Sequence, residues 1–409
     1  MMRGWRAWCL GGLALVAAAG HGQTGTELPD VAAPLPAVPM PAWRIAGEYD
    51  WATEYTVELP SPLRVGPAVN HVIPLRVFIP EGSRGPHRLV LIAHYWGAND
   101  LRSEVSLAQE LAKRNIASAV LTLPYHLQRT PPGERSGALA IQPDPQALRE
   151  TTLQSALDFR RTLDYLLAKP EFRSDRVGIA GTSLGAIVSA LVFSVEPRVT
   201  DAAFILGGID LAGLLWQSSR VVPQRDALRA KGVTLESLRE SLRPVEPAAR
   251  LPRPASFPQN GQALVIVGKF DTVVPGPNSQ LLIDRIPGAH RLEIDTGHYG
   301  GIFVQRRLLR ETASFFGEAF ADRDYVPPTR FYAPTIRLGV SLQTQRGLEV
   351  GGGLDLFALD RAGRWKGTAF ISPSGPQLWI HRGIGAGFSV GAVGSLQRVG
   401  VGLMWSTVL

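Results

Sequence analysis

A serine between two glycines is the residue of this sequence whose surroundings most favour covalent chemistry. Ser183 is the centre of a G-x-S-x-G pattern at residues 181–185, which follows an apolar run at 177–180 and precedes a run of small and apolar residues. This order predicts a strand, a tight turn and a helix. A sharp turn strains the backbone of the serine, so residues 181 and 185 must lack bulk. The N–H groups that begin the helix favour developing negative charge, which makes Ser183 a candidate nucleophile.

A nucleophilic serine needs a base and a group that orients the base, and the sequence offers both downstream. Asp271 follows a strand predicted at 263–267, and His298 follows the last predicted strand in a glycine-flanked loop. In acyl-transfer chemistry His298 takes the proton of Ser183 and later gives it to the leaving group, while Asp271 fixes the imidazole tautomer. We therefore predict a catalytic triad of Ser183, Asp271 and His298.

Two other aspartates bear on the choice of the acid. Asp210 follows the strand predicted at 202–206 and is the main alternative to Asp271, which could merely cap the turn after it. Asp295 is close to His298 in sequence, but we expect it to point elsewhere. The sequence leaves the choice between Asp271 and Asp210 open.

The elements that must position these residues alternate between strands and helices. Apolar runs of strand length lie at 88–94, 118–123, 177–180, 202–206, 263–267 and 291–294, and helical periodicity lies at 100–114, 146–168 and 303–320. This alternation predicts an α/β fold with a doubly wound, mostly parallel sheet. Segments 125–145 and 216–262 interrupt the alternation at the strand ends that carry chemistry in such folds. We expect them to form lids over a substrate cleft.

The order serine, aspartate, histidine resembles that of the α/β-hydrolases, whose nucleophile lies on a strand-to-helix elbow with the G-x-S-x-G pattern. The resemblance covers residues 50–326. The sequence is most similar to the dienelactone-hydrolase-like and prolyl-oligopeptidase-like serine esterases. Dienelactone hydrolases carry cysteine at the elbow, whereas this chain has Ser183, so the resemblance does not imply that activity.

An oxyanion hole should come from two backbone N–H groups. One is that of Leu184, directly after the nucleophile, and the other should lie in residues 94–97, His-Tyr-Trp-Gly. This loop resembles the H-G-x-G loops of esterases, with Tyr95 where a glycine often stands. The Tyr95 N–H is our candidate and that of Trp96 the alternate. Both aromatic side chains could instead line an acyl pocket, and Trp96 could be a core residue.

Other ligand sites find little support in the sequence. No cluster of histidine, aspartate and glutamate has metal-ligand spacing, and no phosphate-binding loop occurs, so we predict neither a metal nor a cofactor. His126, Arg129 and Arg135 in the first lid segment could bind an anionic substrate, although solvated side chains explain them equally well.

The composition is that of a globular protein with an export signal. The chain has 409 residues, 45% of them hydrophobic, and a net charge of +7 without a basic run, which argues against nucleic-acid binding. Residues 1–19 read as a signal peptide, with Arg3 and Arg6 before a short apolar core. They contain Cys9, the only cysteine. Residues 20–49 are rich in proline and alanine, which predicts an extended linker or a surface arm. We expect a periplasmic or secreted protein.

The pattern changes to strand periodicity in residues 327–409. Apolar and polar residues alternate there, and glycine is frequent, which predicts a separate β-module of about five to seven short strands. The strands resemble those of outer-membrane barrels. About 80 residues cannot easily close such a barrel alone, because eight strands are the usual minimum. We therefore expect a small accessory β-domain, through which the protein could contact an outer membrane or the envelope. A shared, oligomeric or membrane-inserted barrel is the alternative.

These patterns together predict an exported serine hydrolase that cleaves small-molecule or lipid carboxylic esters through an acyl-enzyme. A serine peptidase or an acyltransferase could use the same triad. A non-enzymatic envelope binding or assembly protein, with the hydrolase-like part as a scaffold, is the alternative from another class.

Overall fold

The computed structural model describes residues 28–37, 41–82, 85–328, 335–344, 346–358, 365–385, 387–396 and 398–408. The signal peptide predicted at 1–19 lies outside the described residues and stays a prediction.

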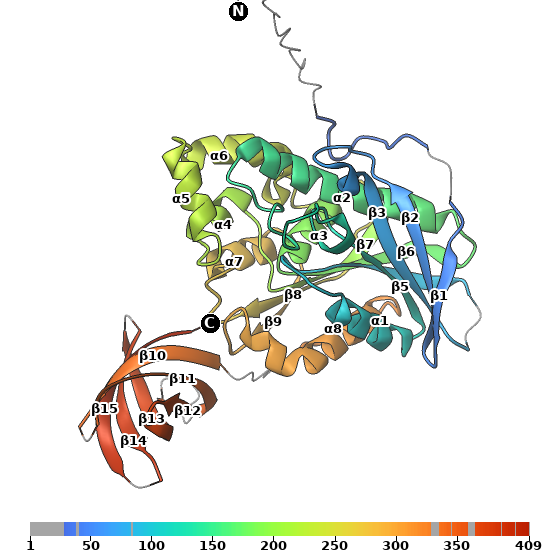
Figure 1. The fold of residues 1–409 in the computed structure, drawn as a ribbon. Helices are drawn as coiled ribbons and strands as arrows, with labels where there is room; N and C mark the ends of the chain where they lie inside the picture. The colour runs from blue at the N-terminus through green and yellow to red at the C-terminus, as the bar shows by residue number, and fades with distance from the viewer. Residues whose placement is uncertain are drawn as a thin grey trace, which may run out of the picture.

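A nine-stranded sheet forms the centre of the larger part of the chain (Figure 1). Its spatial order is β1-β2-β3-β5-β4-β6-β7-β8-β9; β1, β2 and β3 pair antiparallel, and β4 to β9 form the parallel part. The strands are β1 (Arg44–Tyr49), β2 (Ala52–Pro60), β3 (Val72–Pro80), β4 (His87–Ala93), β5 (Ile116–Leu121), β6 (Phe172–Thr182), β7 (Val199–Ile205), β8 (Ala263–Gly268) and β9 (His290–Ile294).

Helices cover both faces of this sheet. Strand β4 shows why: Leu89 and Leu91 pack with residues of α2 and α3, whereas Val90 and Ile92 pack with residues of α1 and α8. A strand buried on both faces needs a continuous apolar run, so the predicted doubly wound α/β fold is confirmed. The helices are α1 (Arg102–Ala112), α2 (Pro145–Leu167), α3 (Leu184–Val195), α4 (Leu211–Gln217), α5 (Val222–Ala230), α6 (Leu235–Leu242), α7 (Gly276–Asp284) and α8 (Gln305–Ala319).

None of the helices within the described ranges combines the length and the apolar character needed to cross a membrane.

The segment 20–49, for which we predicted a linker, packs against the sheet and α2 wherever it is described. Strand β1 pairs with β2, and the side chain of Val31 is buried. Arg160 of α2 donates hydrogen bonds to the carbonyl oxygens of Val31 and Ala33 at 2.8 and 2.7 Å. These contacts join residues far apart in sequence, which composition alone does not reveal.

The C-terminal module is a closed antiparallel barrel of six strands, in which β15 pairs back with β10 (Figure 1). Our expectation that so short a segment would not close a barrel alone was wrong. The strands are β10 (Thr335–Gln343), β11 (Gly347–Ala358), β12 (Trp365–Ser372), β13 (Gly375–Gly385), β14 (Phe388–Gly394) and β15 (Val399–Val408).

Glycines at positions that face the barrel interior explain how so few strands can close. A Cβ added to Gly351 would lie 2.2 Å from the carbonyl oxygen of Ile371, and one added to Gly391 would lie 2.2 Å from that of Ile380. Only a residue without a side chain permits this close approach of neighbouring strands.

Candidate active site

Ser183 lies between β6 and α3 in a backbone conformation that non-glycine residues rarely adopt. Its φ and ψ are 54° and −114°. A Cβ on Gly181 would lie 2.2 Å from the carbonyl oxygen of Gly185, and a Cβ on Gly185 would lie 2.4 Å from that of Ala93. The two glycines of the pattern are therefore sterically required, and the strained turn presents the Ser183 hydroxyl at the end of β6.

The structure brings Ser183, His298 and Asp271 together from three separate loops. The His298 Nε2 atom lies 3.0 Å from the Ser183 Oγ atom, and the His298 Nδ1 atom lies 2.7 Å from the Asp271 Oδ2 atom. Asp271 follows β8 and His298 follows β9, so neighbouring parallel strands deliver the acid and the base to one edge of the sheet. The side chains of His298 and Asp271 are almost completely buried.

The hydrogen bonds around Asp271 determine which nitrogen of His298 carries a proton. The Asp271 Oδ1 atom accepts from the backbone N–H groups of Val273 and Val274, both at 2.8 Å, which leaves Oδ2 for the imidazole. An ionised carboxylate can only accept, so the His298 Nδ1–H donates to Asp271. His298 Nε2 is then free to accept the hydroxyl proton of Ser183.

The alternative acids lie elsewhere in the structure. Asp210 begins α4, where its Oδ1 atom accepts from the Gly213 N–H at 3.1 Å, and it forms an ion pair with Arg239 at 3.0 Å. Asp295 lies 3.3 Å from the Lys269 ammonium. The geometry therefore pairs His298 with Asp271 and not with Asp210 or Asp295.

The backbone groups predicted for the oxyanion hole lie on adjoining segments. Leu184 begins α3, and Gly185 packs directly against the carbonyls of Ala93 and His94, so the start of the helix lies beside the loop 94–97. Within the described chain, the N–H groups of Leu184 and Tyr95 donate to no protein acceptor.

Two buried histidines hold this loop in place, a role that the sequence did not reveal. The His94 Nε2 atom accepts from the Leu123 N–H and the His126 Nε2 atom accepts from the Gly97 N–H, both at 3.0 Å. Burial lowers the pKa of His94 to about 3 and that of His126 to about 4. Both rings are therefore neutral near pH 7, as acceptors at Nε2 must be.

Solved structures share the fold of the larger part of the chain. No protein-family model matches the sequence, and no curated protein matches it. An acetyl xylan esterase from Paenibacillus sp. R4 is similar with a TM-score of 0.53 and 18% identity, over 68% of this chain and 88% of that one. Acetyl xylan esterase 1 from Thermoanaerobacterium sp. JW/SL YS485 is similar with a TM-score of 0.50 and 16% identity, over 66% and 87%.

This part of the chain has the α/β-hydrolase fold. Its strand topology, its elbow and its similarity to the two esterase structures agree on this point. At such low identity the similarity defines the fold and leaves the activity to the site itself.

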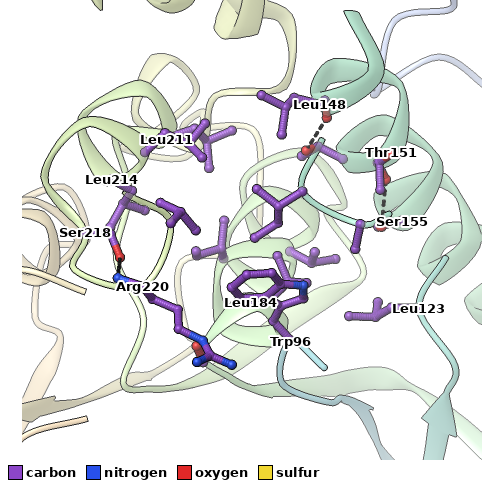
Figure 2. A pocket seen from close by; sticks show the side chains of 18 of the residues that line it. Trp96, Leu123, Leu148, Thr151, Ser155, Leu184, Leu211, Leu214, Ser218 and Arg220 are labelled. Carbon is purple, nitrogen blue, oxygen red and sulfur yellow. Dashed lines mark hydrogen bonds between the residues drawn. The ribbon is translucent and has the colours of Figure 1, made fainter. Parts of the chain in front are cut away.

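An apolar cavity of about 110 Å³ opens beside Ser183 in the α/β-hydrolase domain (Figure 2). Both predicted lid segments contribute to its wall, the first through Ala140 and Ile141 and the second through Val221 and Leu242. The remaining apolar wall comes from α2, α3, α4 and nearby loops. It includes Leu123, Leu148, Leu184, Ile187, Leu211 and Leu214.

Arg220 is the one charged residue on the described wall of this cavity, and no sequence pattern marked it as a site residue. Its guanidinium lies 5.3 Å from the ring centroid of Trp96, which also lines the cavity. The Trp96 indole N–H donates to the Gly137 carbonyl oxygen at 2.7 Å. Of the two roles considered for its side chain, Trp96 thus lines the pocket.

The basic residues suggested for anion binding do not gather there. Arg129 is buried and forms an ion pair with Asp158 at 2.7 Å, and His126 supports the loop at Gly97. Neither these two nor Arg135 lines the cavity. Within the described ranges, no group of histidine, cysteine, aspartate and glutamate side chains could hold a metal ion.

Proposed function

We propose that this protein is an exported serine hydrolase that cleaves carboxylic esters through an acyl-enzyme. The observation that carries the proposal is the hydrogen-bonded series from Asp271 through His298 to Ser183, which ends at a strained elbow. The charged start and apolar core of residues 1–19 support export.

The geometry assigns a role to each group. The Ser183 oxygen attacks the ester carbonyl carbon while its proton passes to His298 Nε2, and the N–H groups of Leu184 and Tyr95 bind the resulting oxyanion. Collapse of this intermediate breaks the ester C–O bond, and His298 gives the proton to the departing alcohol. Water, activated by the same imidazole, then attacks the acyl-enzyme and releases the acid.

The cavity points to an apolar acyl group larger than acetyl. A cavity of about 150 Å³ holds benzene, so one of about 110 Å³ holds roughly four carbons. Each buried methylene contributes about 0.8 kcal/mol. Two methylenes beyond acetyl should therefore raise kcat/KM by about tenfold.

The two similar structures are acetyl xylan esterases by name, so removal of acetyl groups from a carbohydrate is the second candidate. The size of the cavity argues against it, because an acetyl group, with two carbons, would leave about half of that apolar space unfilled.

A series of p-nitrophenyl esters tests the proposal on the full chain. We expect kcat/KM to rise by about tenfold from acetate to butanoate, and turnover to disappear in Ser183→Ala and His298→Ala. Leu214→Trp should fill the cavity and remove the butanoate advantage while acetate hydrolysis persists.

Ile45→Trp, at an exposed residue of β1, is the control and should behave as the parent does. A preference for acetate would favour the carbohydrate deacetylase. Unchanged turnover in folded Ser183→Ala would refute the proposed mechanism, and no hydrolysis of any ester by the folded parent would favour the non-enzymatic alternative.

A further inference from the structure

The outer wall of the barrel is apolar on every strand. Side chains that point outward alternate with side chains that point inward along each strand, and most of the outward positions carry apolar residues. We call these outward apolar residues of β10 to β15 the outer belt. One representative per strand, each between 45% and 69% exposed, is Leu342, Val350, Ile371, Leu378, Val390 and Val401.

The interior of the barrel contains one small apolar cluster, Phe370, Trp379, Val393 and Met404, and its other buried side chains are polar or charged. Asp355 is buried and lies 2.7 Å from the Arg337 guanidinium and 3.3 Å from the Lys366 ammonium. Thr368 lies 2.7 Å from the His381 Nε2 atom. These ions hold one another inside the barrel, where the Arg337 guanidinium lowers the pKa of Asp355 against the effect of burial.

The two ends of the outer belt differ from its middle. Outward aromatic residues lie toward the end at which the chain enters the barrel: Trp365 and Phe388 begin β12 and β14, and Trp405 lies near the end of β15. Outward Arg382 lies near the same end, where it pairs in register with Trp365. Aromatic and cationic side chains are the ones that favour the headgroup region of a lipid bilayer.

The charges of the barrel are complementary to anionic lipid headgroups. Arg346 and Arg398 lie in the turns at the opposite end from Trp365, where they line a small pocket at the mouth of the barrel together with inward Gln377. The two acidic residues of the described barrel, Glu349 and Asp355, hydrogen bond to inward side chains such as Gln377 and Arg337. The outer wall of the strands therefore presents an apolar middle with Arg382 toward one end and no described acidic residue.

We propose that the outer belt lies in lipid hydrocarbon, so that the barrel anchors the α/β-hydrolase domain at a membrane. A second protein would cover one side of the barrel, whereas the belt surrounds it on all six strands. Apolar-out and polar-in alternation is the pattern of membrane barrels. About 9–11 residues cross a bilayer core; β10, β11, β13 and β15 have 9, 12, 11 and 10 residues, whereas β12 and β14 are shorter, with 8 and 7.

Flotation with vesicles of phosphatidylcholine and phosphatidylglycerol tests the anchor on the full chain. We expect the parent to float with the vesicles and to remain bound in high salt, because hydrocarbon contact is not screened. Val350→Asp and Val390→Asp, on strands that are opposite in the barrel, should each weaken partitioning by about tenfold. Hydrolysis of a soluble ester should be unchanged in both.

Ile45→Asp is the matched control, because it places the same charge on an exposed apolar residue outside the barrel and should float as the parent does. If high salt abolished flotation, binding would depend on electrostatic attraction to the lipid headgroups and not on hydrocarbon contact, and the proposal would be overturned. The proposal would also be overturned if the parent protein did not bind the vesicles. If light scattering then showed a discrete dimer, a second copy of the chain would be what covers the outer belt. The ester assay in parallel separates this failure from failure of the proposed function.

Discussion

Among single residues, Asp271 uses its two carboxylate oxygens for two different contacts. One oxygen accepts from Val273 and Val274, which fixes the carboxylate in its loop, and the other receives the His298 Nδ1–H. The residue thus caps a turn and orients the base. Asp210 makes similar local contacts at α4 but has no contact with His298.

Asp271→Asn should lower kcat by about 10³- to 10⁴-fold, because an amide favours the wrong tautomer of His298. Asp210→Asn should keep most of the activity and cost about 1 kcal/mol or less of stability through its weaker cap. Steady-state kinetics with a thermal melt of each variant measure both effects. If Asp210→Asn were the more damaging substitution to kcat, the triad acid would have to be reassigned.

At the scale of elements, loops rather than helices and strands set the geometry of the site. Neutral His126 accepts from Gly97 and neutral His94 accepts from Leu123, so these two hydrogen bonds connect the loop 94–97 to the segment after β5. Protonation of either ring would remove its acceptor nitrogen and place a charge in a buried environment.

Stability should therefore fall with decreasing pH through the window set by these histidines. The unfolded chain binds a proton at His126 near its ordinary pKa of 6.5, whereas the folded chain resists protonation until about 4. Between these values the free energy of unfolding should lose up to about 1.4 kcal/mol per pH unit from this group alone.

His126→Gln keeps an acceptor for Gly97 without a titratable group, so its stability should fall less steeply between pH 6.5 and 4. Urea unfolding of both proteins across this range measures the difference. Parallel pH profiles would show that His126 does not remain neutral in the folded protein.

The sequence predicted the elements well where the signal was local. The apolar runs located the central strands, and the spacing of Gly181, Ser183 and Gly185 located the elbow, because each constraint acts within a few residues. Strand β1 was missed because it forms by pairing with β2. Arg220 was missed because only the packing of the second lid segment brings it to Trp96, and closure of the barrel depends on β15 returning to β10.

At the scale of the whole molecule, the two parts of the chain have separate cores. The two large apolar clusters of the α/β-hydrolase domain contain no described residue of the barrel, which has its own cluster of Phe370, Trp379, Val393 and Met404. The two parts contact each other where the Lys366 ammonium of the barrel lies 4.3 Å from the centroid of the Phe270 ring of the α/β-hydrolase domain. Phe270 directly precedes Asp271.

A chain that ends at Pro328 should therefore fold, stay soluble and hydrolyse soluble esters. Loss of the Lys366 contact should cost about 1 kcal/mol or less, which is small against the stability of a domain of this size. Circular dichroism melts and the ester assay on the truncated chain measure this. Aggregation with exposed apolar surface would instead show that the α/β-hydrolase domain needs the barrel in order to fold.

The central claim is that Ser183 is an activated nucleophile, and reaction with a fluorophosphonate probe tests it most directly. The account predicts a single adduct on the peptide that contains Ser183, absent from Ser183→Ala and formed far more slowly in His298→Ala. A folded parent that forms no adduct, or an adduct that persists in Ser183→Ala, would contradict the account and leave the barrel as the working part of the molecule.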